Sequence, residues 1–384
     1  MNQPDSYVLH DAHIVLANGE IGNGYVAVED GLIAEIGEGK PPERGISLDG
    51  DLLLPGLIEL HTDHLEAHCV PRPKVHWDTV SAVLSYDAQI ATSGITTVLD
   101  SVRVWREELA QDADGQALQL ADGIDSARKA GLLRVEHYLH LRCEVPMPHV
   151  VTDAKTLIDR PEVRLMSLMD HTPGQRQFRD PVKLRDYYRG KSGGMTDAQL
   201  DELFAKRLEN HAKHAARNNA DLLALAKVHD TPLASHDDTT PDHVADAIRD
   251  NVAIAEFPVT MDAATALHGA GVKVMMGAPN LVRGGSHSGN IATEDLARAG
   301  VLDVMSSDYV PSSLLLAALR LPEVTETFDL PAAICTVSKT PAEVVGFKDR
   351  GEIAAGRRAD LIRVHRQGSA AAVRAVWSSG RRVA

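Results

Sequence analysis

Between residues 55 and 345, short apolar segments alternate with stretches long enough to form helices. This alternation is typical of β-strands that are joined by helical crossovers and pair as a parallel sheet. Strand character is found at residues 56–60, 95–99, 134–143, 163–169, 232–235, 252–257, 272–276 and 302–307. Eight such strands predict a (β/α)8 barrel. The alternative is an open doubly wound sheet, but no G-x-G-x-x-G motif follows the first strand.

The two ends of the chain have a different texture. Residues 7–54 alternate apolar and polar positions around NG and DG turn signals, and the tail from 346 returns to short strands between glycine-rich turns. We therefore expect a small β-sandwich domain built from residues 1–54 and 346–384, beside a barrel formed by residues 55–345. The helices of the barrel are expected at 82–92, 117–130, 201–229 and 241–249. Thr196 and Thr240-Pro241 supply helix-start signals for the last two.

Composition excludes several classes of function. Lys and Arg number 39 against 54 Asp and Glu, a net charge of −15, so binding of nucleic acid through a basic surface is not expected. The 3 cysteines form no C-x-x-C pair. The sequence shows no secretory signal and no apolar run long enough to span a membrane. These features predict a cytoplasmic protein without a membrane partner, and they leave a homo-oligomer open.

Imidazole and carboxylate side chains follow several of the predicted strands. The active sites of such barrels lie at the carboxyl ends of the strands, where side chains from all eight strands converge. Burying many ionisable groups at one place costs several kcal/mol each unless a cation compensates. The sequence therefore predicts a site for one or two divalent metals. The residues in these positions are His61, Asp63, Glu144, Asp170, His171, His236, Asp237, Asp238, Glu256 and Asp308.

The chain resembles the amidohydrolase superfamily, on the PG-x-x-E-x-H-x-D start after a β segment and the tail RGEIAAGRRADL. Within it, the chain is similar to the diphosphatases of the carbon–phosphorus lyase pathway. This similarity is carried by LPGLIELHTDHLEAHCVPRPKVHW, SYDAQIATSGITTVLDS, YLHLRCEV, MDHTPGQRQF, ASHDDTT, MMGAPNLVRGGSHSGN and SSDYVP. That family hydrolyses α-D-ribose 1-methylphosphonate 5-triphosphate to the 5-phosphate and pyrophosphate.

The resemblance implies a role for each site residue. Its metal ligands would be His61, Asp63, Glu144, His171, His236 and Asp308, with Glu144 bridging two metals. Asp308 would also take the proton of the attacking water. Zinc is the first expectation for the metal, with manganese or iron as alternatives because Asp63 adds an oxygen ligand. Glu144 falls on the third predicted strand, whereas superfamily members usually carry the bridging group on the fourth. Glu256 therefore competes with His171 for a ligand position.

A triphosphate substrate also requires cations and backbone amides at the barrel mouth. The loop after the seventh predicted strand provides Arg283 and His287, the segment after His171 provides Lys183, and Arg142 lies two residues before Glu144. We expect these four residues to bind the small polyanionic substrate. His64 is expected to face the substrate or to support the metal ligands.

Two other functions stay open at this point. One is an amidohydrolase that acts on a cyclic amide or an N-acetylated sugar, which needs fewer cations. The other is a barrel that has lost its metals and serves as a non-catalytic scaffold, which is disfavoured because nearly every ligand position is filled.

Overall fold

The computed structural model describes residues 6–41, 44–72, 75–105, 116–176, 184–185, 196–286 and 289–384. Its central feature is an 8-stranded sheet in which each strand pairs in parallel with the next one along the chain. The strands are β6 (Leu57–Thr62), β7 (Ile95–Arg103), β8 (Glu136–Glu144), β9 (Val163–Met169), β10 (Leu233–His236), β11 (Ile254–Glu256), β12 (Lys273–Gly277) and β13 (Val304–Ser306). All eight coincide with predicted segments, and the barrel is confirmed.

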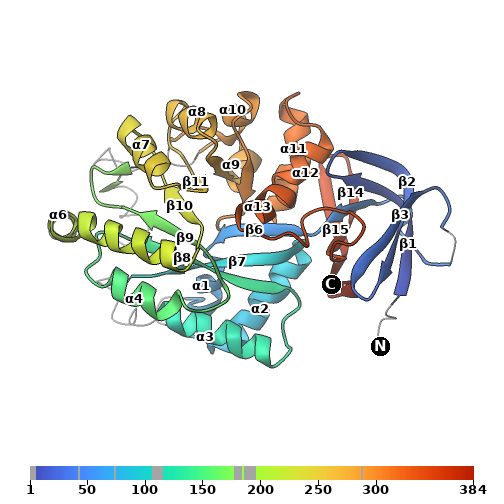
Figure 1. Cartoon of the computed structure of the whole chain (residues 1–384), viewed down its shortest axis with the longest axis horizontal. Helices are drawn as coiled ribbons and strands as arrows, with labels where there is room; N and C mark the ends of the chain where they lie inside the picture. Colours follow the sequence, from blue (N-terminus) through green and yellow to red (C-terminus); the bar gives the residue numbers. More distant parts are fainter. Residues whose placement is uncertain are drawn as a thin grey trace.

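Helices follow the strands and surround the barrel (Figure 1). They are α1 (His64–Cys69), α2 (Thr79–Thr92), α3 (Gln116–Lys129), α4 (Val150–Leu157), α6 (Asp197–Val228), α7 (Pro241–Arg249), α8 (Met261–Gly269), α9 (Ala278–Arg283), α10 (Thr293–Arg298), α11 (Ser313–Val324), α12 (Leu330–Cys335) and α13 (Lys339–Val344). Helix α6 begins four residues before the predicted start, because Thr196 and Gln199 form a complete capping box. No helix among the described residues is both long and apolar enough to cross a membrane.

The first and last strands meet through a single bridge and a buried carboxylate. Thr62 and Asp308 form an isolated parallel bridge beyond the end of β13. Below it, the carboxylate of Glu59 accepts hydrogen bonds from the backbone N–H of His61 (2.7 Å), the hydroxyl of Ser306 (2.8 Å) and the backbone N–H of Ser307 (2.6 Å). Glu59 therefore supplies side-chain bonds between β6 and β13 where the backbone ladder is nearly absent.

The interior of the barrel carries an apolar layer to which nearly every strand contributes. Its buried strand residues are Ile58, Leu60, Leu99, Leu165, Ala234, Ile254, Met275 and Val304. Ala342 and Val345, from the end of α13 and the residue after it, pack against the same cluster. A larger cluster fills the space between the outer strand faces and the helices. Burying both faces of the sheet explains why the strands read as apolar runs in the sequence.

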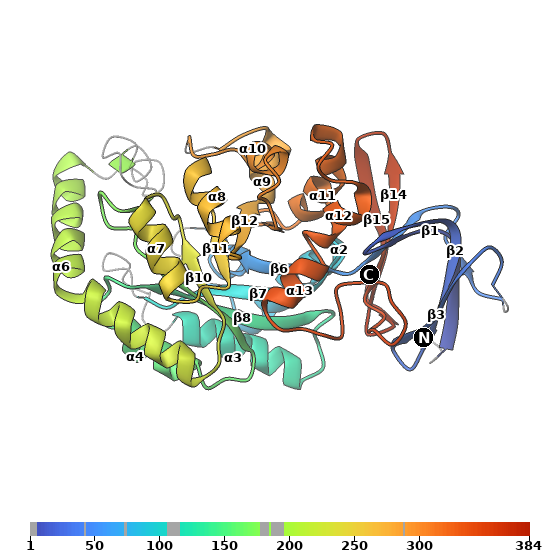
Figure 2. The same ribbon diagram turned by 45° about the horizontal axis from the view of Figure 1, so that its top comes forward.

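The two ends of the chain form one further sheet beside the barrel (Figures 1 and 2). Its strands are β1 (Ser6–Leu16), β2 (Gly19–Glu29), β3 (Leu32–Glu38), β4 (Ile46–Ser47), β5 (Leu52–Pro55), β14 (Leu361–Gln367), β15 (Ala370–Ser378) and β16 (Arg381–Arg382). The join between the two ends is the antiparallel pair β5–β14. The predicted small domain is thus a single hydrogen-bonded sheet around its own buried cluster, which includes Trp377. The domain boundaries after residues 54 and 345 stay a prediction.

Candidate metal and catalytic site

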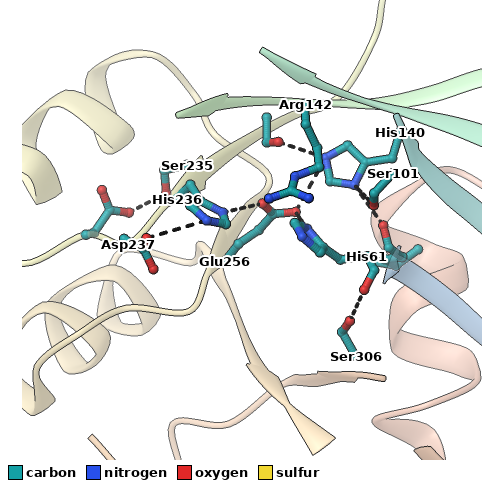
Figure 3. Close-up of polar contacts among 12 residues, drawn as sticks. His61, Ser101, His140, Arg142, Ser235, His236, Asp237, Glu256 and Ser306 are labelled. Carbon is teal, nitrogen blue, oxygen red and sulfur yellow. Dashed lines mark hydrogen bonds and ion pairs between the residues drawn. The ribbon is translucent and has the colours of Figure 1, made fainter. Parts of the chain in front are cut away.

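A polar layer follows the apolar layer along the barrel strands, and Figure 3 shows polar contacts among several of its residues. On most strands its members come two residues after an apolar interior residue, because alternate side chains of a strand point to the same face. The layer contains Ser101, His140, Ser167, His236, Glu256 and Ser306. The same alternation on β8 carries Arg142 and Glu144 toward the mouth. The polar residues that the sequence predicted at the strand ends are therefore continued by a second set within the barrel.

Glu256 holds two of the predicted histidine ligands. Its Oε1 accepts from Nδ1 of His61 (3.0 Å), and its Oε2 accepts from Nδ1 of His236 (2.9 Å). The two imidazole rings stack with centroids 5.7 Å apart. Burial lowers the pKa of His61 well below its ordinary value, and burial lowers the pKa of His236 to about 3. Both rings are therefore neutral at pH 7, with the proton on Nδ1 and a lone pair on Nε2.

His171 is positioned in the same way by a different carboxylate. Nδ1 of His171 donates to Glu144 Oε2 (2.5 Å), and the backbone N–H of His171 donates to Glu144 Oε1 (2.6 Å). Burial alone would raise the pKa of Glu144, but the contacts with His171 hold it below its ordinary value. The structure thus brings together Glu144 from the third barrel strand and His171 from the end of the fourth.

Asp237 lies near the Nε2 atoms of both His236 and His171. Its Oδ2 is 3.5 Å from Nε2 of His236 and 3.9 Å from Nε2 of His171. This oxygen is buried and has no hydrogen-bond partner among the described residues. Burial raises the pKa of Asp237 to about 7. An unpartnered buried carboxylate oxygen that faces two imidazole nitrogens costs free energy unless another group compensates it.

These residues fit a divalent metal. The ligand atoms of His171, His236 and Asp237 lie within 4.8 Å of one another, as do those of His61, His140 and Glu256. Nitrogen and carboxylate ligands suit zinc, manganese or iron. Histidine ligands commonly carry a carboxylate on the second ring nitrogen, which fixes the ring and its tautomer. Glu256 and Glu144 have that arrangement on His61, His236 and His171.

The group formed by His171, His236 and Asp237 is the stronger candidate for a metal site. In the other group, both ring nitrogens of His140 already have protein partners. Its Nδ1 lies 2.9 Å from the carbonyl of Leu60, and its Nε2 lies 2.9 Å from the hydroxyl of Ser167. With the carbonyl as acceptor, Nδ1 is the donor and Nε2 accepts from Ser167. No lone pair of His140 is left for a metal.

Asp63 lies at the mouth in contact with two arginines. Its Oδ2 is 3.2 Å from Nη1 of Arg142 and 3.4 Å from Nη2 of Arg103. Burial would raise the pKa of Asp63, but Arg142 and Arg103 hold it below its ordinary value. Asp63 also ends the strand, because it is the residue before helix α1 and its backbone is no longer extended. The structure therefore places two guanidinium groups beside one of the predicted metal ligands.

Asp308 follows the last strand in a left-handed backbone conformation, with φ 52°. Such a conformation is uncommon for a residue with a side chain, and it is often found at functional sites. Burial, followed by the negative charge of Asp63, raises the pKa of Asp308 to about 7. A carboxyl group with a pKa near the working pH can both accept and return a proton.

The remaining predicted residues lie around this centre or outside the described residues. His64 lies on the first turn of α1, with Nε2 3.2 Å from Oε1 of Gln89 on α2. Arg283 is exposed at the end of α9, after the seventh barrel strand. Lys183 and His287 lie outside the residues that the structure describes.

Three residues of the site were not singled out from the sequence: Glu59, Arg103 and His140. Each lies within a strand rather than after it, so a search at strand ends misses them. For Arg103 and His140 the alternation of the strand is the signal that finds them, whereas Glu59 lies between the interior residues Ile58 and Leu60 and alternation does not find it. His140 comes two residues before Arg142 on the interior face of β8, and Arg103 comes two residues after Ser101 on that of β7.

Comparisons with known proteins agree with this fold. A family model described as an amidohydrolase family matches residues 184–384. The α-D-ribose 1-methylphosphonate 5-triphosphate diphosphatase of Escherichia coli (strain K12) is 43% identical over 379 residues, which cover 98% of this chain and 100% of that protein.

Solved structures show the same fold at low sequence identity. A 5-methylcytosine deaminase from Klebsiella pneumoniae has a TM-score of 0.65 at 14% identity and covers 98% of both chains. An N-acetylglucosamine-6-phosphate deacetylase from Pasteurella multocida has a TM-score of 0.62 at 12% identity and covers 98% of this chain and 99% of that one.

Proposed function

Because the chain belongs to the amidohydrolase family of metal-dependent hydrolases, we propose that it hydrolyses α-D-ribose 1-methylphosphonate 5-triphosphate to the 5-phosphate and pyrophosphate. The observation that carries this proposal is the 43% identity to the Escherichia coli diphosphatase over 98% of this chain and 100% of that protein. The polar centre at the barrel mouth supports it, because it combines carboxylates and imidazoles with arginines that suit a polyanionic substrate.

The residues proposed to hold the metals fall in two neighbouring places. One divalent ion would be held by Nε2 of His171, Nε2 of His236 and Oδ2 of Asp237. Glu144 lies beside this place, where it accepts from Nδ1 of His171. His61, through Nε2, and Asp63 would hold a second. Zinc is the first choice, with manganese and iron as alternatives. A bound divalent ion would polarise phosphoryl oxygens and lower the pKa of a nearby water.

Asp308 would accept a proton from the attacking water. The water oxygen forms a bond to the α-phosphorus or the β-phosphorus of the triphosphate chain. The P–O bond between that phosphorus and the oxygen that bridges the two then breaks. Attack at the α-phosphorus expels pyrophosphate with the bridging oxygen, and the 5-phosphate gains the water oxygen. Attack at the β-phosphorus expels the 5-phosphate with the bridging oxygen, and pyrophosphate gains the water oxygen. Arg142 and Arg103, which lie beside Asp63, would meet negative charge on the substrate. Arg283, Lys183 and His287 stay predicted substrate contacts.

Release of pyrophosphate from the proposed substrate tests the function directly. The purified protein is assayed with this triphosphate, with a panel of cyclic amides and with N-acetylated amino sugar phosphates, each before and after chelation. We expect pyrophosphate release only from the triphosphate, lost on chelation and restored by added metal. Hydrolysis of an amide with no pyrophosphate release would overturn the proposal in favour of the other hydrolase. Purified protein that neither contains nor binds metal would favour the scaffold. The cytoplasmic location and the homo-oligomer stay predictions.

A further inference from the structure

Two arginines stand side by side at the mouth of the barrel. Arg103 and Arg142 are register partners on the adjacent parallel strands β7 and β8, so their side chains leave the sheet on the same face. Both contact Asp63, and Nη2 of Arg103 also lies 3.0 Å from Oε2 of Glu66. The two guanidinium carbons lie 5.8 and 5.9 Å from the ring centroid of Trp105. Arg142 and His140 come from the same strand, which places Arg142 next to the polar layer (Figure 3).

Arg142 has donor capacity that Asp63 does not use. Nε of Arg142 is buried and has no hydrogen-bond partner among the described residues. The side chain of Arg142 is 12% exposed and that of Arg103 is 25% exposed, so both are largely desolvated but still reachable from the mouth. A buried guanidinium donor without an acceptor costs free energy until an acceptor reaches it.

We propose that Arg103 and Arg142, whose guanidinium groups lie over the ring of Trp105, form a clamp that binds the pyrophosphate portion of the substrate and holds it as it leaves. This inference rests on the proposed function. The methylphosphonate ester at the other end of the substrate carries a single negative charge, whereas the triphosphate chain carries several. Two adjacent guanidinium groups therefore match the triphosphate chain. Arginine is also suited to bidentate contact with phosphate oxygens, and its planar group stacks on aromatic rings.

Carboxylates at the clamp tune its affinity. Asp63 and Glu66 bring as many negative charges as the two arginines bring positive ones. Asp63 is also a proposed metal ligand. A metal ion bound to Asp63 would offset the negative charge of its carboxylate, so Asp63 would then neutralise the two arginines less. Glu66 lies on α1 outside the proposed ligand set, and it lies closer to Arg103 than Asp63 does, at 3.0 Å against 3.4 Å. Removing the charge of Glu66 should therefore strengthen the binding of an anion.

Binding of inorganic pyrophosphate to the metal-loaded protein tests the clamp without turnover. Arg103→Gln should weaken binding about ten- to a hundredfold, the loss expected for a charge-assisted contact. Glu66→Gln should strengthen it about two- to fivefold, a gain that misfolding cannot produce. Arg217→Gln serves as the matched control, because Arg217 is 86% exposed on α6 and its loss changes the net charge equally. Any affinity of pyrophosphate for the metal alone is common to all variants and cancels in the comparison.

The monomethyl ester of methylphosphonic acid serves as the second probe and represents the other end of the substrate. Unchanged pyrophosphate affinity in both Arg103→Gln and Glu66→Gln would overturn the clamp. Loss of affinity for the methylphosphonate ester alone would also overturn it, because the pair would then bind the opposite end. If the wild-type protein fails to hydrolyse the triphosphate yet binds pyrophosphate through Arg103, the proposed substrate is wrong and the anion clamp stands.

Discussion

Replacing Glu256 by Gln should weaken metal binding because one carboxylate fixes two imidazole tautomers. Both oxygens of Glu256 accept a proton-bearing Nδ1, at 3.0 Å from His61 and 2.9 Å from His236. The Gln amide has one oxygen that can accept and one nitrogen that can only donate. One of the two imidazoles must therefore turn over or move its proton to Nε2. A protonated Nε2 has no lone pair for a metal.

The size of the expected loss in metal affinity follows because one histidine loses the carboxylate that positions its ring. Removing such a partner typically lowers metal affinity about 10- to 100-fold, which corresponds to about 1.4–2.7 kcal/mol. The change is measured by competition between the protein and a chromophoric chelator, with zinc and with manganese. Isolated metal content is a second readout that does not depend on turnover.

A matched control separates this loss of metal affinity from the general effect of removing a buried carboxylate. Asp360 is also buried, but it accepts from the backbone N–H of Ser379 and contacts Arg358 near the small sheet. Asp360→Asn should lower stability and leave metal affinity unchanged. Wild-type metal affinity in Glu256→Gln, with both proteins folded, would refute the proposed tautomer control.

Three further changes test other parts of the site. Asp308→Asn should reduce turnover by about 100-fold or more while metal content stays near that of the wild type, because a proton acceptor is lost; near-normal turnover would exclude this role. In the metal-free protein, burial raises the pKa of Asp237 from 3.8 to about 7, so the folded state binds more protons than the unfolded chain between these values and stability falls as the pH rises. Asp237→Asn should therefore raise the free energy of unfolding at pH 8, by at most about 4 kcal/mol, and change it little at pH 4; urea unfolding at the two pH values measures this, and an equal effect at both would contradict it. Glu59→Gln should lower the free energy of unfolding by about 1–3 kcal/mol, because a donor group replaces one oxygen of a carboxylate that accepts from His61, Ser306 and Ser307; unchanged urea midpoints would show that Glu59 does not help to close the barrel.

The strands of the barrel could be predicted because each is buried on both faces and followed by a helix-length segment. The second half of the barrel shows this most clearly, where Thr240 and Pro241 fix the start of α7 at the predicted residue. Helix α6 was less accurate at its start, since the capping box at Thr196 extends it beyond its apolar pattern. Local signals of this kind act over a few residues and can be read without knowing the rest of the chain.

The contacts within the site could not be read in the same way. Nothing near Glu256 in the sequence shows that it holds both His61 and His236, which lie 195 and 20 residues away. The pairing of Arg103 with Arg142 depends on the exact register between β7 and β8. A shift of one residue would turn one of the two side chains to the outer face.

The sequence by itself determined the succession of strands and helices, the apolar layer and the kinds of side chain available at the barrel mouth. Those properties follow from periodicity and residue type, which act locally. Only the tertiary structure decided which nitrogen of each histidine is free, which carboxylate lies beside which cation, and which buried oxygen has no partner. These depend on distances of a few Å between residues far apart in the chain, and such distances are set by the closure and register of the whole barrel.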